Sequence, residues 1–395
     1  EYADRTLITD FAQDGVAELR ASISSTGTYM AAQFDRCKRA DEMSRTSVSS
    51  SGSLNTRRLH LHNISDDIFN TIENLQQGKS HGVQLLVDYS GSMMKNLLSI
   101  IEQAALMIDF CQKANIPYEV YGFTSVASNT LRQREKMYAN ASTPDDQLLT
   151  TDCTYYKIAS STQSKAENEL GVEIALRFGF YWSGRYYRGA QDFINQISVQ
   201  MGGTPTHQAL VGMVNLTERF KLNNNVQVTN LIVFTDGGDG CGLLCSKDNM
   251  CKEAKATRYP EVRSLTIIDT KTRKQYTSVT RDDSQVALFD ILQTRLGINI
   301  IYIKMEDVST LKWFISRNSN TRVADTDTLK KSPLVKLTDN STVTTILMKP
   351  PKRDVSSMVK DNTVTKASFK KAMKGNKDAR VFANLVVDEI TANFV

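Results

Sequence analysis

The sequence has no long apolar segment. No apolar run reaches the roughly 18–20 residues that a membrane-spanning helix needs, so no membrane partner is expected. A secretory signal is also missing, and the chain begins at Glu1 rather than at methionine. We therefore expect a fragment, a trimmed form or a proteolytically matured product.

Cysteine is scarce as well. The six cysteines lack the spacing of a disulfide framework, and a chain of 395 residues can build a core without one. An intracellular, reducing origin is therefore predicted, with Cys111 as a core thiol. Zinc could bind three clustered thiols and a fourth ligand such as Cys153 or a histidine. The three are Cys241, Cys245 and Cys251. Their spacing is not that of a standard zinc knuckle, so we favour the interpretation that they are thiols of a glycine-rich loop that bind no metal.

Charge of one sign is not in large excess. The 48 basic and 43 acidic residues give a net charge of +5, which is too small to indicate nucleic-acid binding. Residues 349–380 are more strongly basic, with ten basic and three acidic side chains. This stretch could touch nucleic acid or an acidic partner, but the interpretation we favour is a solvated connector.

Catalytic motifs are missing too. No nucleophile–base pair is evident, and Asp239 and Glu253 lack a spacing that would indicate acid–base work. The phosphate-binding motif G-x-x-x-x-G-K-[ST] is absent, so any ATP hydrolysis would belong to a partner. We expect no enzyme, but at most a non-catalytic subunit of an ATPase or chelatase complex.

What the sequence does contain is an alternation of buried strands and helices. Val83–Val87 and Tyr118–Phe123 are short apolar runs, and Leu97–Lys113 between them has apolar residues at helical spacing. This predicts a strand–helix–strand unit with a right-handed crossover. Further helices are predicted at 167–180, 186–199, 206–220, 284–296 and 309–317, and strands at 228–235 and 298–305. With 41% apolar residues, the pattern predicts a globular α/β domain.

The predicted domain spans residues 81–348, with insertions at about 124–200 and 237–282. Residues 1–80 are an N-terminal extension with helix-like stretches at 10–22 and 30–45 and a serine-rich linker at 47–53. Residues 349–395 are the basic connector and a C-terminal helix at 381–390.

Aromatic rings and arginines gather in the first insertion. They form either a contact surface for a partner or the packing of the insertion onto the sheet, and the sequence favours neither. The residues are Arg177, Phe178, Phe180, Tyr181, Trp182, Arg185, Tyr186, Tyr187 and Arg188.

Three segments place hydroxyl and carboxylate groups at the ends of these elements. The run Asp88-Tyr89-Ser90-Gly91-Ser92 follows the first strand, Gly202-Gly203-Thr204 precedes a helix, and Asp236 ends the strand at 228–235. Alone, the first run is equally well explained as a strand-to-helix turn with a serine cap. In an open α/β sheet, however, all three segments lie at the carboxyl edge, where ligand sites gather. We expect an exposed loop site there, with Thr206 as a helix cap and His207 on the surface.

Together the three segments resemble the metal-ion-dependent adhesion site of the von Willebrand factor A (VWA) family. The resemblance implies a Rossmann-like α/β fold, with a doubly wound, mostly parallel sheet, helices on both faces, and here N-terminal and C-terminal helical extensions. It also implies a site for Mg²⁺ or Mn²⁺ in which hydroxyls bind the ion and carboxylates act through water or hydrogen bonds. The site residues are Asp88, Ser90, Ser92, Thr204 and Asp236. The family's glycine-glycine-threonine order favours Thr204 over Thr206.

Such a set suits a hard cation, which takes oxygen ligands and keeps several waters. Because its direct ligands are neutral, the ion retains the charge with which to accept a carboxylate from a protein partner. The site is therefore predicted to be a docking point.

Four stretches outside the site resemble one branch of the VWA family: 54–60, 65–69, 79–82 and 116–123. They are similar to VWA proteins related to the T subunit of aerobic cobaltochelatase, in the version encoded by large tailed bacteriophages. The resemblance extends over roughly residues 50–320. It implies a ring-forming MoxR-type AAA+ ATPase as the partner, which the VWA protein serves as adaptor. The two insertions depart from the chelatase subunit, which puts a cobalamin role in doubt.

Three functions follow from these observations. The first is a metal-dependent interaction module for an AAA+ ATPase in the host cytoplasm of a phage-infected cell. The second is a structural or tail-associated protein of the virion, with phage structural proteins as partners. The third is a chelatase subunit acting on a tetrapyrrole, for which the sequence offers no candidate binding site.

Overall fold

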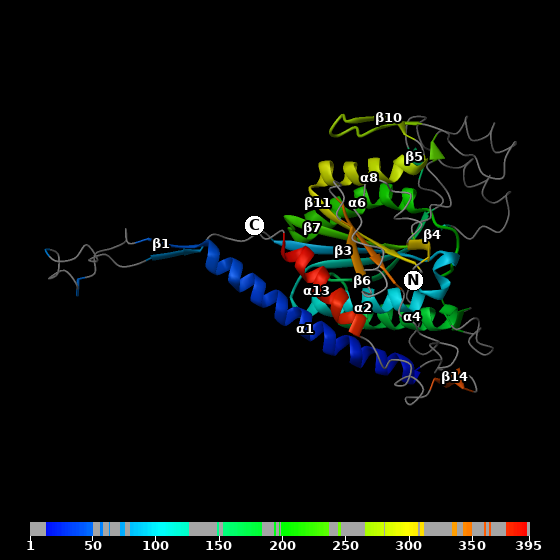
Figure 1. Cartoon of the computed structure of the whole chain (residues 1–395), viewed down its shortest axis with the longest axis horizontal. Coiled ribbons are helices and arrows are strands. Elements are labelled where there is room, and N and C mark those ends of the chain that lie inside the picture. The colour runs from blue at the N-terminus through cyan, green and yellow to red at the C-terminus, as the bar shows by residue number, and fades with distance from the viewer. Residues whose placement is uncertain are drawn as a thin grey trace.

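The computed structural model describes residues 13–49, 56–57, 63, 72–75, 80–125, 148–149, 153–183, 193–194, 197, 199–236, 244–245, 265–279, 281–306, 309–311, 334–337, 343–349, 359–360, 363–364 and 377–392. A seven-stranded sheet with helices on both faces lies at the centre of these residues (Figure 1).

The sheet has the strand order β12-β13-β11-β7-β3-β4-β6. Its five inner strands are parallel, and the edge strands β12 and β6 are antiparallel to their neighbours. From β3 the chain passes first to β4 and β6 on one side, and later to β7, β11 and β13 on the other. In chain order the strands are β3 (His81–Asp88), β4 (Tyr118–Ser125), β6 (Cys153–Ser160), β7 (Val228–Thr235), β11 (Ile298–Met305), β12 (Leu334–Leu337) and β13 (Thr344–Met348).

Both faces of the sheet are apolar, because side chains along each inner strand alternate between two cores. On β7, Ile232 and Phe234 belong to one core, whereas Leu231 and Val233 belong to the other. The inner strands are therefore almost continuously apolar in sequence, which is why they could be predicted as buried parallel strands.

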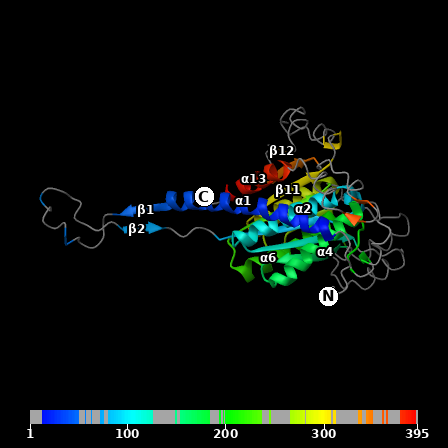
Figure 2. The same ribbon diagram turned by 90° about the horizontal axis from the view of Figure 1, so that it is seen from below.

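Each core is closed by its own helices (Figures 1 and 2). On one face lie α2 (Leu97–Lys113), α4 (Lys165–Ser183) and α13 (Lys377–Thr391), and on the other α6 (Thr206–Asn224) and α8 (Arg281–Leu296). Helix α2, which follows β3, and α8, the first described helix after β7, thus cover opposite faces. This confirms the predicted doubly wound α/β fold.

Helix α1 (Gln13–Arg45) packs on the outer side of α2 and also contacts α13 and α4. The rings of Phe34 and Phe110 meet edge to face with centroids 5.6 Å apart. At Gly27 the two helices approach so closely that a Cβ would lie 2.0 Å from Asp109 Oδ2. We expected two helical stretches here. The serine- and threonine-rich middle has low helix propensity, but packing on α2 outweighs it and the helix is continuous.

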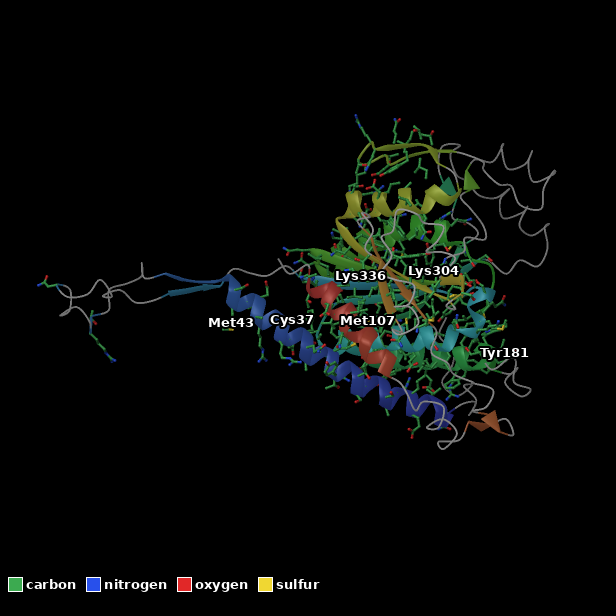
Figure 3. All side chains as sticks on the ribbon, in the orientation of Figure 1. Cys37, Met43, Met107, Tyr181, Lys304 and Lys336 are labelled. Atoms are coloured by element: carbon green, nitrogen blue, oxygen red, sulfur yellow. The ribbon has the colours of Figure 1, made fainter. Side chains whose placement is uncertain are left out.

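A two-stranded antiparallel ribbon of β1 (Thr46–Ser49) and β2 (Ile72–Leu75) follows α1 and points away from the sheet (Figures 1 and 2). Cys37 and Met43 lie on the part of α1 that leads to this ribbon (Figure 3). The predicted serine-rich linker overlaps β1, and its remainder lies outside the described residues.

Both segments that were predicted as insertions contain regular structure. Residues 124–200 supply β6, an edge strand of the sheet, and α4, which packs against α2. Residues 237–282 supply the hairpin of β9 (Leu265–Ile268) and β10 (Gln275–Val279), which packs against α8. The domain boundaries themselves stay a prediction. The remaining short strands are β5 (Leu148–Leu149), β8 (Leu244–Cys245), β14 (Val359–Lys360) and β15 (Thr363–Val364).

Several predicted elements have nearly the observed bounds, namely α2, β7 and β11. The helices predicted at 186–199 and 309–317 fall largely outside the described residues, which show helix at 193–194 and 309–311. Within the described part of the chain, no helix is long and apolar enough to cross a membrane.

Candidate metal centre

The candidate site lies at the carboxyl ends of β3 and β7, which are neighbours in the sheet. Asp88 is the last residue of β3, and Asp236 comes directly after β7. The strand order reverses at this pair, because β4 comes after β3 on one side of the sheet and β11 comes after β7 on the other. Ligands of open α/β sheets bind at such a switch point, since the diverging connections leave a crevice there.

Asp88 is fully buried and is held by neutral donors. Its Oδ1 accepts a hydrogen bond from the amide of Ser90 at 2.9 Å, and its Oδ2 accepts one from the hydroxyl of Thr235 at 2.8 Å. Burial, together with the negative charge of Asp236, raises the pKa of Asp88 to about 7, against the lowering effect of these hydrogen bonds. Two carboxylates therefore share a buried corner in which a cation would favour the ionised form of Asp88.

Two serine hydroxyls follow this carboxylate in the chain and are hydrogen-bonded to each other. The Oγ atoms of Ser90 and Ser92 are 3.0 Å apart, with Ser90 buried and Ser92 exposed. Metal–oxygen bonds of about 2.0–2.1 Å in an octahedron place adjacent ligand oxygens about 3.0 Å apart. The two hydroxyls are thus spaced as neighbouring ligands of one Mg²⁺ or Mn²⁺ ion. The 3-10 helix η3 (Gly91–Lys95) begins between them.

The glycine-glycine-threonine loop runs parallel to the end of β3. The amide of Gly91 donates to the carbonyl of Gly202 at 3.0 Å, and the amide of Gly202 donates to the carbonyl of Tyr89 at 3.3 Å. Thr204, two residues on, is buried. The loop is therefore tied to the same segment that carries both serines, as the predicted site requires.

A lysine lies on the β7 side of the site. Lys304 on β11 is in register with Thr235, and Figure 3 shows its place on the strand. Burial lowers the pKa of Lys304, and the charges of Glu306 and Asp236 oppose this effect.

Three expectations about the surroundings of the site are wrong. Asp88 and Ser90 are buried, not parts of an exposed loop, because the following loop and β7 close over the end of β3. Thr206 does not cap α6. It is the helix's first residue, and Pro205 occupies the cap position without a side-chain hydrogen bond. His207 is buried, because the start of α6 packs against the sheet.

Three further polar residues support the site and were not predicted from the sequence. Thr235 binds Asp88 directly, and Thr124 and Ser125 at the end of β4 contact the glycine loop. A hydroxyl at the last positions of a buried strand was the available signal for all three.

Two weaker predictions have different outcomes. Cys241 and Cys251 lie outside the described residues, as does the side chain of Cys245, so the zinc hypothesis stays untested there. The aromatic residues favour the packing alternative, because Phe178, Phe180 and Tyr181 are buried and the ring of Phe178 lies 5.2 Å from that of Tyr89. Tyr186, Tyr187, Arg185 and Arg188 lie outside the described residues.

Among the described residues, no three His, Cys, Asp or Glu side chains gather as a metal cluster. The candidate centre differs from such clusters because hydroxyls supply three of its five groups. A doubly wound sheet with hydroxyls and carboxylates at its switch point is the arrangement that the sequence predicted from its resemblance to VWA domains.

Comparison with known families narrows this class. Residues 68–178 match the family described as the cobalamin biosynthesis protein CobT VWA domain, so this part of the chain is similar to that VWA domain. The match includes Asp88, Ser90 and Ser92 but ends before Thr204 and Asp236.

No curated protein matches the chain. Among solved structures, the PilB minor pilin from Streptococcus sanguinis is similar at 12% identity and a TM-score of 0.32, over 84% of this chain and 67% of that chain. A likeness at this level says nothing about function.

Proposed function

We propose that this VWA domain binds one Mg²⁺ or Mn²⁺ ion and uses it to dock a protein partner. The observation that carries the proposal is the pair of hydrogen-bonded serine hydroxyls 3.0 Å apart, on the segment whose Ser90 amide is bonded to the buried Asp88. Ser90, Ser92 and Thr204 would bind the ion, and Asp88 and Asp236 would hold its waters and hydroxyls. The ion supplies a positive charge that accepts a carboxylate from the partner.

The buried and exposed sides of the site support docking from one direction. Asp88, Ser90 and Asp236 are buried behind the site, whereas Ser92 and Gly203 are exposed. An approaching carboxylate would meet the ion from the Ser92 side. Because neutral hydroxyls leave most of the ionic charge in place, the partner's carboxylate would be the strongest ligand.

For the partner we propose a ring-forming MoxR-type AAA+ ATPase, which this chain would serve as adaptor in a bacteriophage-infected cell. The resemblance of the sequence to phage-encoded VWA proteins related to the cobaltochelatase T subunit supports this partner and this setting, and the family match at residues 68–178 agrees with a CobT-like domain. The chain itself would contribute no catalysis. A cobaltochelatase-type subunit is the second candidate, which the description of the matching family favours.

The test has two stages. Wild-type protein and Ser90→Ala are titrated with Mn²⁺, and both are then used as bait in lysate of infected cells with Mg²⁺ or with EDTA. We expect Mn²⁺ binding and Mg²⁺-dependent capture of an AAA+ ATPase by the wild type alone. Capture of capsid or tail proteins instead would support the virion alternative. Capture that is unaffected by EDTA and by Ser90→Ala would rule out the metal as the docking point.

A further inference from the structure

Strand β4 contributes no predicted metal ligand, yet it ends beside the site with two buried hydroxyls. Thr124 and Ser125 are its last residues and are 1% and 2% exposed. The strand pairs with β3 up to the pair Asp88–Phe123, so these hydroxyls lie just beyond the level of Asp88.

Both hydroxyls are directed to the peptide of Gly203. The Ser125 Oγ accepts a hydrogen bond from the Gly203 amide at 2.6 Å, and the Ser125 amide donates to the Gly203 carbonyl at 3.1 Å. The Thr124 hydroxyl donates to the same carbonyl at 3.4 Å. Both backbone polar groups of Gly203, its amide and its carbonyl, are thus bonded to the end of β4.

The loop is held on its other side by the segment that carries the serines, through the bonds of Gly202 with Tyr89 and Gly91. Gly202 itself has no room for a side chain. A Cβ there would lie 2.7 Å from the Ser125 carbonyl oxygen and 2.8 Å from Ser125 Oγ. The loop is therefore wedged between the ends of β3 and β4, and its first glycine is required by that close approach.

We propose that Ser125 is a positioning residue for the metal centre, which fixes the Gly203 peptide so that the Thr204 hydroxyl stands in its ligand position before the ion arrives. The inference rests on the proposed metal site and adds to it a residue outside the ligand set. Thr204 is the next residue after the peptide that Ser125 holds. Loss of the hydrogen bond between Ser125 Oγ and the Gly203 amide would release the loop from β4 on one side and leave Thr204 less well placed for the ion.

A purely structural role is the competing explanation, and Ser160 provides a matched control. Ser160 is also a buried strand serine whose Oγ accepts a backbone amide, that of Thr162 at 3.2 Å. It lies at the last residue of β6, at the opposite end of the sheet, paired with Glu119. Ser160→Ala therefore removes the same kind of bond far from the site.

The experiment measures Mn²⁺ affinity by titration calorimetry, and melting temperature without metal, for the wild type, Ser125→Ala, Ser125→Thr and Ser160→Ala. We expect Ser125→Ala to bind Mn²⁺ about 10- to 100-fold more weakly, as is typical when a group that orients a metal ligand is lost. Ser125→Thr keeps the hydroxyl and should retain most of the affinity. Ser160→Ala should lower the melting temperature without changing the affinity.

Unchanged affinity of Ser125→Ala would overturn the inference, and so would an equal loss in Ser160→Ala. If Ser125→Ala does not fold, Ser125→Cys keeps the volume and weakens the acceptor, and the same affinity loss is expected of it. If the wild type binds no Mn²⁺, the proposed function fails, and the inference fails with it.

Discussion

Two buried aspartates of this domain have opposite surroundings. Asp269, in the turn after β9, accepts hydrogen bonds from the Thr272 hydroxyl and two backbone amides, and its Oδ1 lies 3.2 Å from Arg295 Nη1. Burial raises its pKa, but these donors and the arginine charge outweigh burial, so its pKa is lowered. Asp88 receives only neutral donors among the described residues and faces a second carboxylate, so its pKa is raised. The negative charge of Asp269 is therefore compensated by donors and an arginine of the same chain, whereas the negative charge of Asp88 would be stabilised by an added cation.

The largest expected effect is a loss of metal affinity, which we expect for a change at Asp88 and not for a change at Asp269. Asp88→Asn keeps the shape of the side chain but removes the charge behind the ion. Loss of a buried charged partner typically costs about 2–5 kcal/mol, so Mn²⁺ should bind about 30- to several-thousand-fold more weakly. Asp269→Asn is the matched control and should bind Mn²⁺ like the wild type in the same calorimetric titration. Equal affinities for both variants would remove Asp88 from the site.

The second effect is a pH dependence of stability that only one of the two aspartates causes. Folded Asp88 keeps its proton up to about pH 7, because burial and Asp236 raise its pKa, whereas an unfolded aspartate loses its proton near pH 4. The folded state thus binds more protons between these values, and metal-free stability should fall as pH rises from about 4 to about 7, by on the order of 2–4 kcal/mol. Added Mg²⁺ should restore stability most above pH 7, where Asp88 is ionised.

Urea unfolding at pH 5 and pH 8, with Mg²⁺ and with EDTA, checks this. Asp88→Asn should lose this pH dependence and the response to Mg²⁺. If the stability of the wild type in EDTA rises from pH 5 to pH 8, and that of Asp88→Asn rises by the same amount, the raised pKa of Asp88 is contradicted.

The third effect is a loss of metal-free stability, which we expect when Asp269 is changed and not when Asp88 is changed. Asp269→Asn leaves Arg295 and the amides of the turn without their charged acceptor, and should lower the free energy of unfolding by about 1–3 kcal/mol. Asp88→Asn should not destabilise the metal-free protein at pH 8, because it removes a buried charge next to Asp236. Chemical denaturation of both variants in EDTA measures the difference. A larger loss in Asp88→Asn would mean that its charge is compensated in the folded chain.

The smallest effect concerns the hydroxyls that serve the two carboxylates. Thr235→Val and Thr272→Val each remove one donor, at 2.8 Å from Asp88 and 2.5 Å from Asp269 respectively. Each should cost about 0.5–1.5 kcal/mol of stability. Only Thr235→Val should also weaken the stabilisation by Mg²⁺, which thermal melting with and without the ion would detect. An equal response of both variants to Mg²⁺ would place the ion's effect elsewhere.

Much of the fold could be predicted because its signals are local. β7 and β11 are apolar runs of strand length, and α2 has helical periodicity, so their bounds emerge from the sequence alone. β6 and α4 were assigned to an insertion, because β6 is half-exposed along much of its length and lacks a continuous apolar run. α1 was divided in two because the contact of Gly27 with Asp109 leaves no sequence pattern.

For the candidate site, the sequence predicted the location of the ligands but not the contacts that bury and support them. Motif residues at strand ends indicated where the ligands gather, since parallel strands end at one edge. The burial of Asp88 and the hydrogen bond between Ser125 and Gly203 could not be predicted. They depend on contacts between segments 78 or more residues apart, which no local pattern records.

Binding of the ion at this site is tested most directly by a crystal structure grown with Mn²⁺, in which anomalous scattering locates the ion. We expect an anomalous peak at the carboxyl ends of β3 and β7. The hydroxyls of Ser90, Ser92 and Thr204 should lie at about 2.0–2.2 Å from it. A metal bound by Cys241, Cys245 and Cys251, with the serines pointing away from it and no peak beside Asp88, would rule out the proposed metal site.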